Sequence, residues 1–155
     1  VCEPLYRIYA KYPVKNGKCW FSDLPKYSTN LPVKFFIPYN YSTGFIMISY
    51  TDSKYADYWL KYIDSEEKFL NKLNNNLRKM FPDRNIPDPL WVKHHYWRHG
   101  AAYWKVNSDS NKLIKEVVKP FKNKNIYICG ENYSSHQAWM EGALQTSDMV
   151  LKLIL

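Results

Sequence analysis

Apolar and polar positions alternate in short runs through the first part of the chain, as they do in strands that bury one face. Residues 4–12 alternate and are rich in aromatic and β-branched side chains, which predicts a strand. Residues 33–38 and 45–50 flank a turn-forming loop at 39–44, which predicts antiparallel pairing of the flanking segments. A further short strand is expected at residues 19–21.

Helical spacing replaces this alternation after Ser65. Ser65 followed by Glu66 and Glu67 has the residues of a capped, acidic helix start, and Pro82 predicts the end of that helix. Its apolar stripe is expected at Phe69, Leu73, Leu77 and Met80 or Phe81. The asparagines at 74–76 lie mostly off this stripe. A shorter helix before it would bury Ala56, Trp59 and Leu60.

The second part of the chain continues the mixture of strands and helices. Residues 90–92 predict a strand that leads into a segment rich in histidine and tryptophan. Ser108 and Asp109 predict the start of a helix over 112–118. The predicted fold class is α+β: an antiparallel sheet with packing helices, followed by a last strand and helix.

The segment from Ile126 onwards carries the most specific pattern. Apolar residues 126–129 predict a buried strand, including Cys129, and Gly130 and Glu131 follow as a turn with a carboxylate. A final helix is expected from Ala138. Its apolar face would contain Trp139, Ala143, Met149, Val150, Leu153 and Ile154. A helix start after a small-residue turn suits an anionic or electron-rich ligand, because unpaired backbone N–H groups point at it.

Composition narrows the classes of partner. The 155-residue chain has no apolar run long enough to cross a bilayer, so no membrane partner is expected. Its three cysteines cannot form a fully paired disulfide framework, which favours a reducing, intracellular compartment. The net charge of +8 raises nucleic-acid binding as an alternative. The densest basic segment contains Lys112, Lys115, Lys119, Lys122 and Lys124. Since most aromatic residues lie at core-like spacing, we interpret the lysines as solvated surface and expect no nucleic-acid partner.

The four histidines do not predict a metal site. Adjacent His94 and His95 point to opposite sides of a strand, and neither His99 nor His136 has a cysteine or carboxylate at ligand spacing. We therefore expect no metal.

The segment Ile-Tyr-Ile-Cys-Gly-Glu, followed after a loop by Trp-Met-Glu-Gly-Ala, resembles the closing flavin-binding segment of FAD-dependent amine oxidases. That family includes monoamine, polyamine and L-amino-acid oxidases. The resemblance implies that the acidic residue and nearby backbone amides hold the ribityl-pyrophosphate part of FAD, and that the helix start faces the isoalloxazine. The cofactor-binding positions it implies are Gly130, Glu131, Ala138, Trp139 and Met140.

The turn from Gly100 to Tyr103 is similar to the family's Gly-x-x-Tyr turn beside the flavin ring. In the mammalian monoamine oxidases the residue before that tyrosine is a cysteine bonded to the flavin. Here it is Ala102, so the resemblance implies non-covalent FAD. It also implies that Tyr103 and Trp139 form an aromatic cage around a small amine substrate, with Trp104 as a rival for the role of Tyr103.

Arg7 departs from the family pattern. The resemblance places it where the family often has a lysine that contacts flavin N5 through water, so it is the third candidate catalytic residue. Arginine keeps the charge but cannot relay a proton. Two hypotheses therefore stay open: oxidation of an amine to an imine, with oxygen as acceptor and hydrogen peroxide as product, or an inactive structural or partner-binding protein. The substrate class is open too, with Arg98 as a candidate for contacting a substrate carboxylate.

The glycine pattern bears on domain organisation. The five glycines are too widely spaced to form the GxGxxG fingerprint that opens a dinucleotide-binding unit. We expect the chain to be the C-terminal part of a larger flavoprotein whose remaining N-terminal part is its partner. Residues 1–106 would belong to the substrate-binding domain, and residues 107–155 would end the FAD-binding domain.

Overall fold

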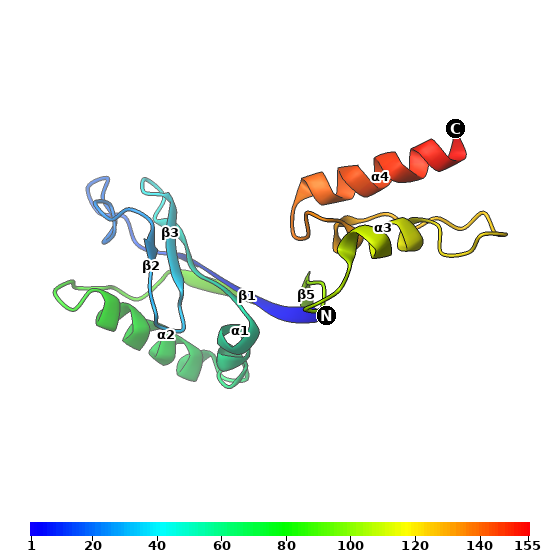
Figure 1. Cartoon of the computed structure of the whole chain (residues 1–155). Coiled ribbons are helices and arrows are strands. Elements are labelled where there is room, and N and C mark those ends of the chain that lie inside the picture. Colours follow the sequence, from blue (N-terminus) through cyan, green and yellow to red (C-terminus); the bar gives the residue numbers. More distant parts are fainter. The chain divides into compact units, whose positions relative to one another are not determined.

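The computed structural model describes all of residues 1–155, which divide into two compact units (Figure 1). One unit is Pro4–Gly100, and the other combines Val1–Glu3 with Ala101–Leu155. Helices and antiparallel strands occur together, which confirms the predicted α+β class. The assignment of residues 1–106 to a substrate-binding domain and 107–155 to an FAD-binding domain stays a prediction.

The unit Pro4–Gly100 is built on a five-stranded sheet with the order β2-β3-β4-β1-β5. Its strands are β1 (Cys2–Lys11), β2 (Tyr27–Ser28), β3 (Phe35–Asn40), β4 (Phe45–Asp52) and β5 (Trp91–Ala102). Strand β4 pairs antiparallel with both β1 and β3, so the strand pairing predicted around the 39–44 loop is confirmed. The β1–β4 register shifts between Ile8 and Tyr9.

Two helices follow β4: α1 (Ser53–Leu60) and α2 (Glu66–Met80). The Ser65 side chain accepts a hydrogen bond from the Lys68 N–H, as its capping position predicts. The stripe is confirmed, since Phe69, Leu73 and Leu77 are buried. The expectation that the asparagines lie off the buried face is wrong for two of them, Asn74 and Asn76, which are also buried. Their amide nitrogens donate to the Asp88 carboxylate and the Lys72 carbonyl, which offsets part of the cost of burial; the Asn74 side-chain oxygen is buried without a partner.

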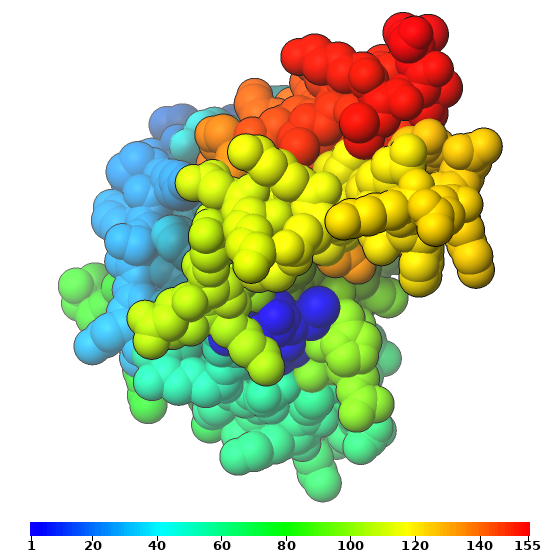
Figure 2. Space-filling model, turned by 45° about the vertical axis from the view of Figure 1, so that its right-hand side comes forward, coloured from blue at the N-terminus to red at the C-terminus, as the bar shows by residue number.

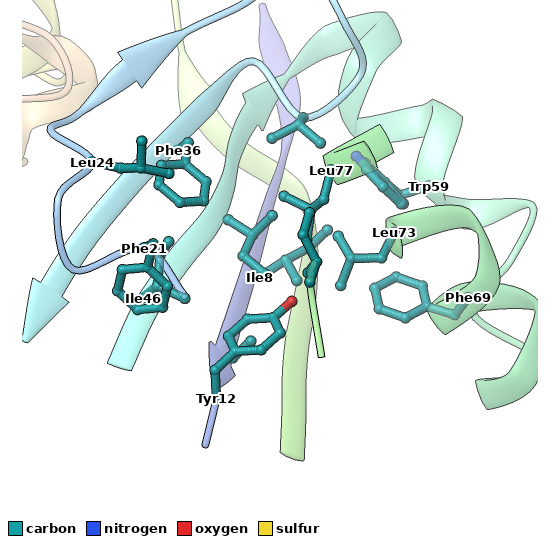
Figure 3. Packing of buried hydrophobic residues seen from close by; sticks show 14 of the residues in the cluster. Ile8, Tyr12, Phe21, Leu24, Phe36, Ile46, Trp59, Phe69, Leu73 and Leu77 are labelled. Atoms are coloured by element: carbon teal, nitrogen blue, oxygen red, sulfur yellow. The ribbon is translucent and has the colours of Figure 1, made fainter. Parts of the chain in front are cut away.

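The core of this unit lies between one sheet face and these two helices (Figure 3). Alternation along β1 points Tyr6, Ile8 and Ala10 at the helices, with no exposed surface. Their partners include Phe36, Ile46, Trp59, Phe69, Leu73 and Leu77. The opposite face of β1 carries Leu5, Arg7 and Tyr9, which are partly exposed.

Residues 19–21 form turns, so the strand predicted there is wrong. The Ser22 hydroxyl accepts the Cys19 N–H at 2.8 Å, and the Leu24 N–H donates to the Phe21 carbonyl at 2.9 Å. A serine that bonds the backbone three residues away closes a turn in competition with strand pairing. Phe21 is nevertheless fully buried in the core.

The other unit contains α3 (Ser110–Val118), the short 3₁₀ helix η1 (Glu131–Tyr133) and α4 (Met140–Ile154), with α3 and α4 in contact. The Asp109 carboxylate caps α3 by accepting the Lys112 N–H at 3.1 Å, as predicted. Residues 126–129 do not form a strand, so the strand predicted there is wrong: this unit offers no partner strand for them. The Ile128 N–H donates to the Val118 carbonyl at 3.1 Å. Cys129 is exposed, so its predicted burial is wrong.

Helix α4 begins two residues after the predicted start, but its apolar face is largely uncovered. Gly142 and Thr146 are its buried residues, whereas Leu153, Ile154 and Leu155 are exposed. In Figure 2 these terminal residues, in red, stand at the surface. The periodicity therefore predicted the helix correctly and its burial incorrectly. No helix of the chain combines the length and apolar character needed to span a membrane.

Candidate functional site

The loop between Gly130 and Gly142 is closed by hydrogen bonds at both ends. Gly130 has φ of +145°, which an L side chain rarely adopts, and the space where a Cβ would stand is open. Its N–H donates to the hydroxyl of Thr146 at 2.9 Å, and Thr146 is fully buried on α4. The turn after residues 126–129 is thereby fixed to the final helix.

Ser134 holds the middle of this loop. Its hydroxyl is buried, donates to the Glu131 carbonyl at 2.7 Å and accepts the His136 N–H at 3.1 Å. Helix α4 passes so close that a Cβ on Gly142 would overlap both the Ser134 hydroxyl and the His136 carbonyl. Only glycine permits this approach without a shift of the loop or the helix.

Glu131 shapes the start of α4. One oxygen of its carboxylate accepts the Ala138 N–H at 2.6 Å. Ala138 has φ of +65°, a left-handed conformation that costs free energy for a residue with a Cβ. A charge-assisted hydrogen bond of this length offsets that cost. The two residues predicted to contact FAD are thus brought together directly before the helix.

The first turn of α4 is open to a ligand. Trp139 is its N-cap residue and provides no side-chain cap. N–H groups of the first turn therefore point at solvent, where they can donate to a ligand. Trp139 and Met140 are 69% and 78% exposed. An uncapped helix start, an open backbone at Gly130 and exposed apolar side chains are features that a flavin would use, so the residues present fit the cofactor that the sequence suggests.

Trp104 and Gln137 anchor the loop to the preceding segment. The indole N–H of Trp104 donates to the Ser134 carbonyl at 3.0 Å, and its backbone N–H donates to the Gln137 side-chain oxygen at 3.0 Å. The Gln137 amide in turn donates to the Asn132 carbonyl at 2.7 Å. The sequence analysis did not predict this network. The feature of the sequence that points to it is the run of polar residues before the helix. Because the Trp104 indole is used in this way, it is a weaker candidate for a ligand contact.

Tyr103 is tied to the N-terminus through its backbone. Its N–H donates to the Val1 carbonyl at 2.8 Å, and its carbonyl accepts the terminal ammonium at 2.8 Å. Figure 2 shows the blue N-terminal residues beside this yellow-green segment. The Tyr103 residue is 43% exposed, and neither it nor Trp139 belongs to a buried core. That the two rings face each other across a substrate channel stays a prediction.

Arg7 lies on the sheet face away from the core. Its guanidinium carbon stands 3.0 Å from the ring centroid of Tyr50, its partner in register on β4. Burial lowers the pKa of Arg7, and the neighbouring Tyr50 opposes that shift. The guanidinium also donates to the Tyr6 carbonyl at 3.5 Å, a long hydrogen bond. It forms no ion pair with any carboxylate of the chain.

Two of the four histidines, His94 and His95, pack against aromatic rings. His94 stacks on Phe69 with ring centroids 4.4 Å apart and lies 5.7 Å from the ring of Tyr6. Burial, and then the neighbouring His95, lower the pKa of His94. No group of three histidine, cysteine or acidic side chains is arranged to hold a metal ion.

Comparison of the sequence with known proteins identifies the family to which this chain belongs. Residues 4–150 match the model of the flavin-containing amine oxidoreductases. The chain is also 32% identical over 141 residues to Uncharacterized protein R188 of Acanthamoeba polyphaga mimivirus. That match covers 79% of this chain and 27% of the relative, so the chain spans about a quarter of the relative's length. The chain belongs to the flavin-containing amine oxidoreductases.

Proposed function

We propose that this chain is the C-terminal portion of an FAD-dependent oxidase that converts amines to imines, with oxygen as electron acceptor and hydrogen peroxide as product. The observation that carries the proposal is the loop from Gly130 to Gly142, which ends at an uncapped helix start beside Glu131. FAD, when bound, would supply the chemistry by accepting a hydride equivalent from the carbon that bears the amine. The remaining part of the flavoprotein would supply the pyrophosphate cradle.

The cofactor would be held without a covalent bond. Ala102 is buried and has no nucleophilic atom where a linking cysteine would stand. Binding would therefore rest on the first-turn N–H groups of α4, on Gly130 and Glu131, and on the backbone at Trp139 and Met140. The Glu131 carboxylate uses one oxygen for Ala138, which leaves the other for a ribityl hydroxyl.

Tyr103 and Trp139 would act on the substrate rather than on the flavin. Two partly exposed aromatic side chains offer electron-rich faces that attract an ammonium group and orient its carbon. Arg7 would supply a fixed positive charge, because a guanidinium does not give up its proton near neutral pH. Arg7 would therefore not relay a proton.

The alternative is an inactive protein that keeps the fold. The stacking of Arg7 on Tyr50 favours it, because the side chain that stands in place of the relay lysine is already engaged. Absence of flavin reduction in an FAD-loaded protein would distinguish this alternative from an enzyme.

The test uses the complete gene product reconstituted with FAD. Anaerobic mixing with an amine panel should bleach the oxidised flavin absorbance, and admission of air should restore it with one peroxide per imine formed. A protein that binds FAD stoichiometrically and is bleached by no amine supports the inactive alternative. A protein that takes up no FAD contradicts both the enzyme proposal and the assigned loop.

A further inference from the structure

A pocket of about 630 Å³ opens where helix α2 ends, within the unit Pro4–Gly100. The chain turns directly after this helix, and the Arg84 N–H donates to the Phe81 carbonyl at 3.2 Å. The lining comes from the end of α2, from this turn and from Trp20 and Leu24. No residue proposed to contact FAD or the amine lines the pocket, which makes it a separate site.

Two aromatic side chains form a corner of the pocket. The ring centroids of Trp20 and Phe81 lie 5.7 Å apart, and the ring planes are inclined by 66°. Both residues are partly exposed. The indole nitrogen of Trp20 is buried and has no acceptor in the chain, so the ring surface that can face the pocket is carbon alone. The faces of aromatic rings attract cations, and tryptophan does so most strongly.

The charges around the pocket also favour a cation. Arg84 lines the pocket, but its guanidinium already donates to both carboxylate oxygens of Asp23, at 2.7 and 2.6 Å. Asp83 lines the pocket too, is exposed and forms no ion pair within the chain. The last carbonyl groups of α2 add the negative end of a helix dipole. The basic side chains of that last turn, Arg78 and Lys79, do not line the pocket.

We propose that this pocket binds an organic ammonium ion, with its alkyl groups in the corner between Trp20 and Phe81 and its charge balanced by Asp83. A metal ion would need several oxygen ligands, and Asp83 is the only carboxylate that lines the pocket. An anion would meet Asp83 as a like charge. The ammonium ion would act here as an effector and not as a substrate, because the residues proposed to contact the flavin belong to the other unit.

The experiment uses the complete gene product and two probes of nearly the same shape, choline and the uncharged 3,3-dimethylbutan-1-ol. Proton NMR follows the methyl resonance of each probe during titration. Choline methyl groups that contact the ring faces should shift upfield, and choline should bind about 10-fold more tightly than the alcohol. Asp83→Asn should weaken choline binding by about 2- to 5-fold and leave the alcohol unchanged. Trp20→Phe should weaken choline binding by about 3- to 10-fold, because phenylalanine attracts cations less strongly.

Asp64→Asn is the matched control, since it removes the same charge from an exposed residue that does not line this pocket, and it should match wild type. Trp139→Ala should also match wild type, which separates this pocket from the proposed amine cage. Equal affinity for the two probes would overturn the inference, and so would equal losses in Asp83→Asn and Asp64→Asn.

Choline binding that survives Asp83→Asn and disappears in Trp139→Ala would assign the ammonium ion to the cage and overturn the inference as well. Thermal unfolding checks that Trp20→Phe is folded. If it is not, the comparison of Asp83→Asn with Asp64→Asn decides the outcome, because both positions are exposed. Amine oxidation does not enter any readout, so failure of the proposed oxidase function would leave this test intact.

Discussion

Gly142→Ala should destabilise the protein although alanine is the better helix former. In the middle of a helix the change from glycine to alanine would stabilise by about 1 kcal/mol. Here the new Cβ would overlap the Ser134 hydroxyl and the His136 carbonyl, one of which is backbone and cannot rotate away. Overpacking of this kind costs about 1–3 kcal/mol. Displacing Ser134 also weakens its hydrogen bonds to Glu131 and His136, at about 1 kcal/mol each.

The net effect is a loss of about 2–4 kcal/mol in the free energy of unfolding, because the overlap and the weakened hydrogen bonds outweigh the propensity gain. Denaturant unfolding followed by circular dichroism measures it, and FAD content should fall in parallel because the loop and the helix start move together. Ala143→Gly is the matched control at the neighbouring position, where propensity alone predicts a loss of about 1 kcal/mol. A Gly142→Ala protein as stable as wild type, or more stable, would refute the close approach of α4 to the loop.

Three further outcomes are expected. Trp139→Ala should lower amine turnover while leaving FAD content nearly unchanged, since the side chain is exposed and the backbone faces the cofactor; undiminished oxidation would remove the aromatic cage. Trp104→Phe should cost about 1 kcal/mol and weaken FAD binding, because the Ser134 carbonyl loses its donor; dye-monitored unfolding and FAD titration measure both. For His94 the folded pKa lies below the unfolded value, so the unfolded state binds the proton more readily and stability should fall as pH drops below about 6.5. His94→Gln should flatten that part of the melting-temperature profile, and an unchanged profile would contradict the burial of this ring.

Local sequence patterns predicted the strands and helices correctly where the residues that a segment packs against or bonds to lie within the chain. The alternation at 4–12 gave a strand because Tyr6, Ile8 and Ala10 do meet the helices. Ser65 gave the start of α2 because a cap depends on only three following residues. The same reasoning predicted the starts of α3 and α4 to within about two residues.

Patterns failed where the outcome depends on distant surfaces or on loop geometry. The apolar pattern of 126–129 and of α4 predicts burial, but several of these side chains, including Ile126, Leu153 and Ile154, are exposed. The hydrogen bonds of Trp104 to residues about thirty positions away depend on how the loop folds, which no periodicity describes. Gly130 and Glu131 could be singled out from sequence, whereas the buried hydroxyl of Ser134 that connects them to α4 could not.

The Gly130–Gly142 loop also has a kinetic consequence. Ser134, Gln137 and Trp104 satisfy its polar groups internally, so its conformation is set when the chain folds and not when a ligand arrives. A receptor with a preformed backbone loses little further backbone entropy at the moment of association. Stopped-flow mixing with FAD should therefore give one exponential phase whose rate rises linearly with FAD concentration. A slow, concentration-independent phase is the signature of a loop that must first rearrange, and Gly142→Ala should introduce one.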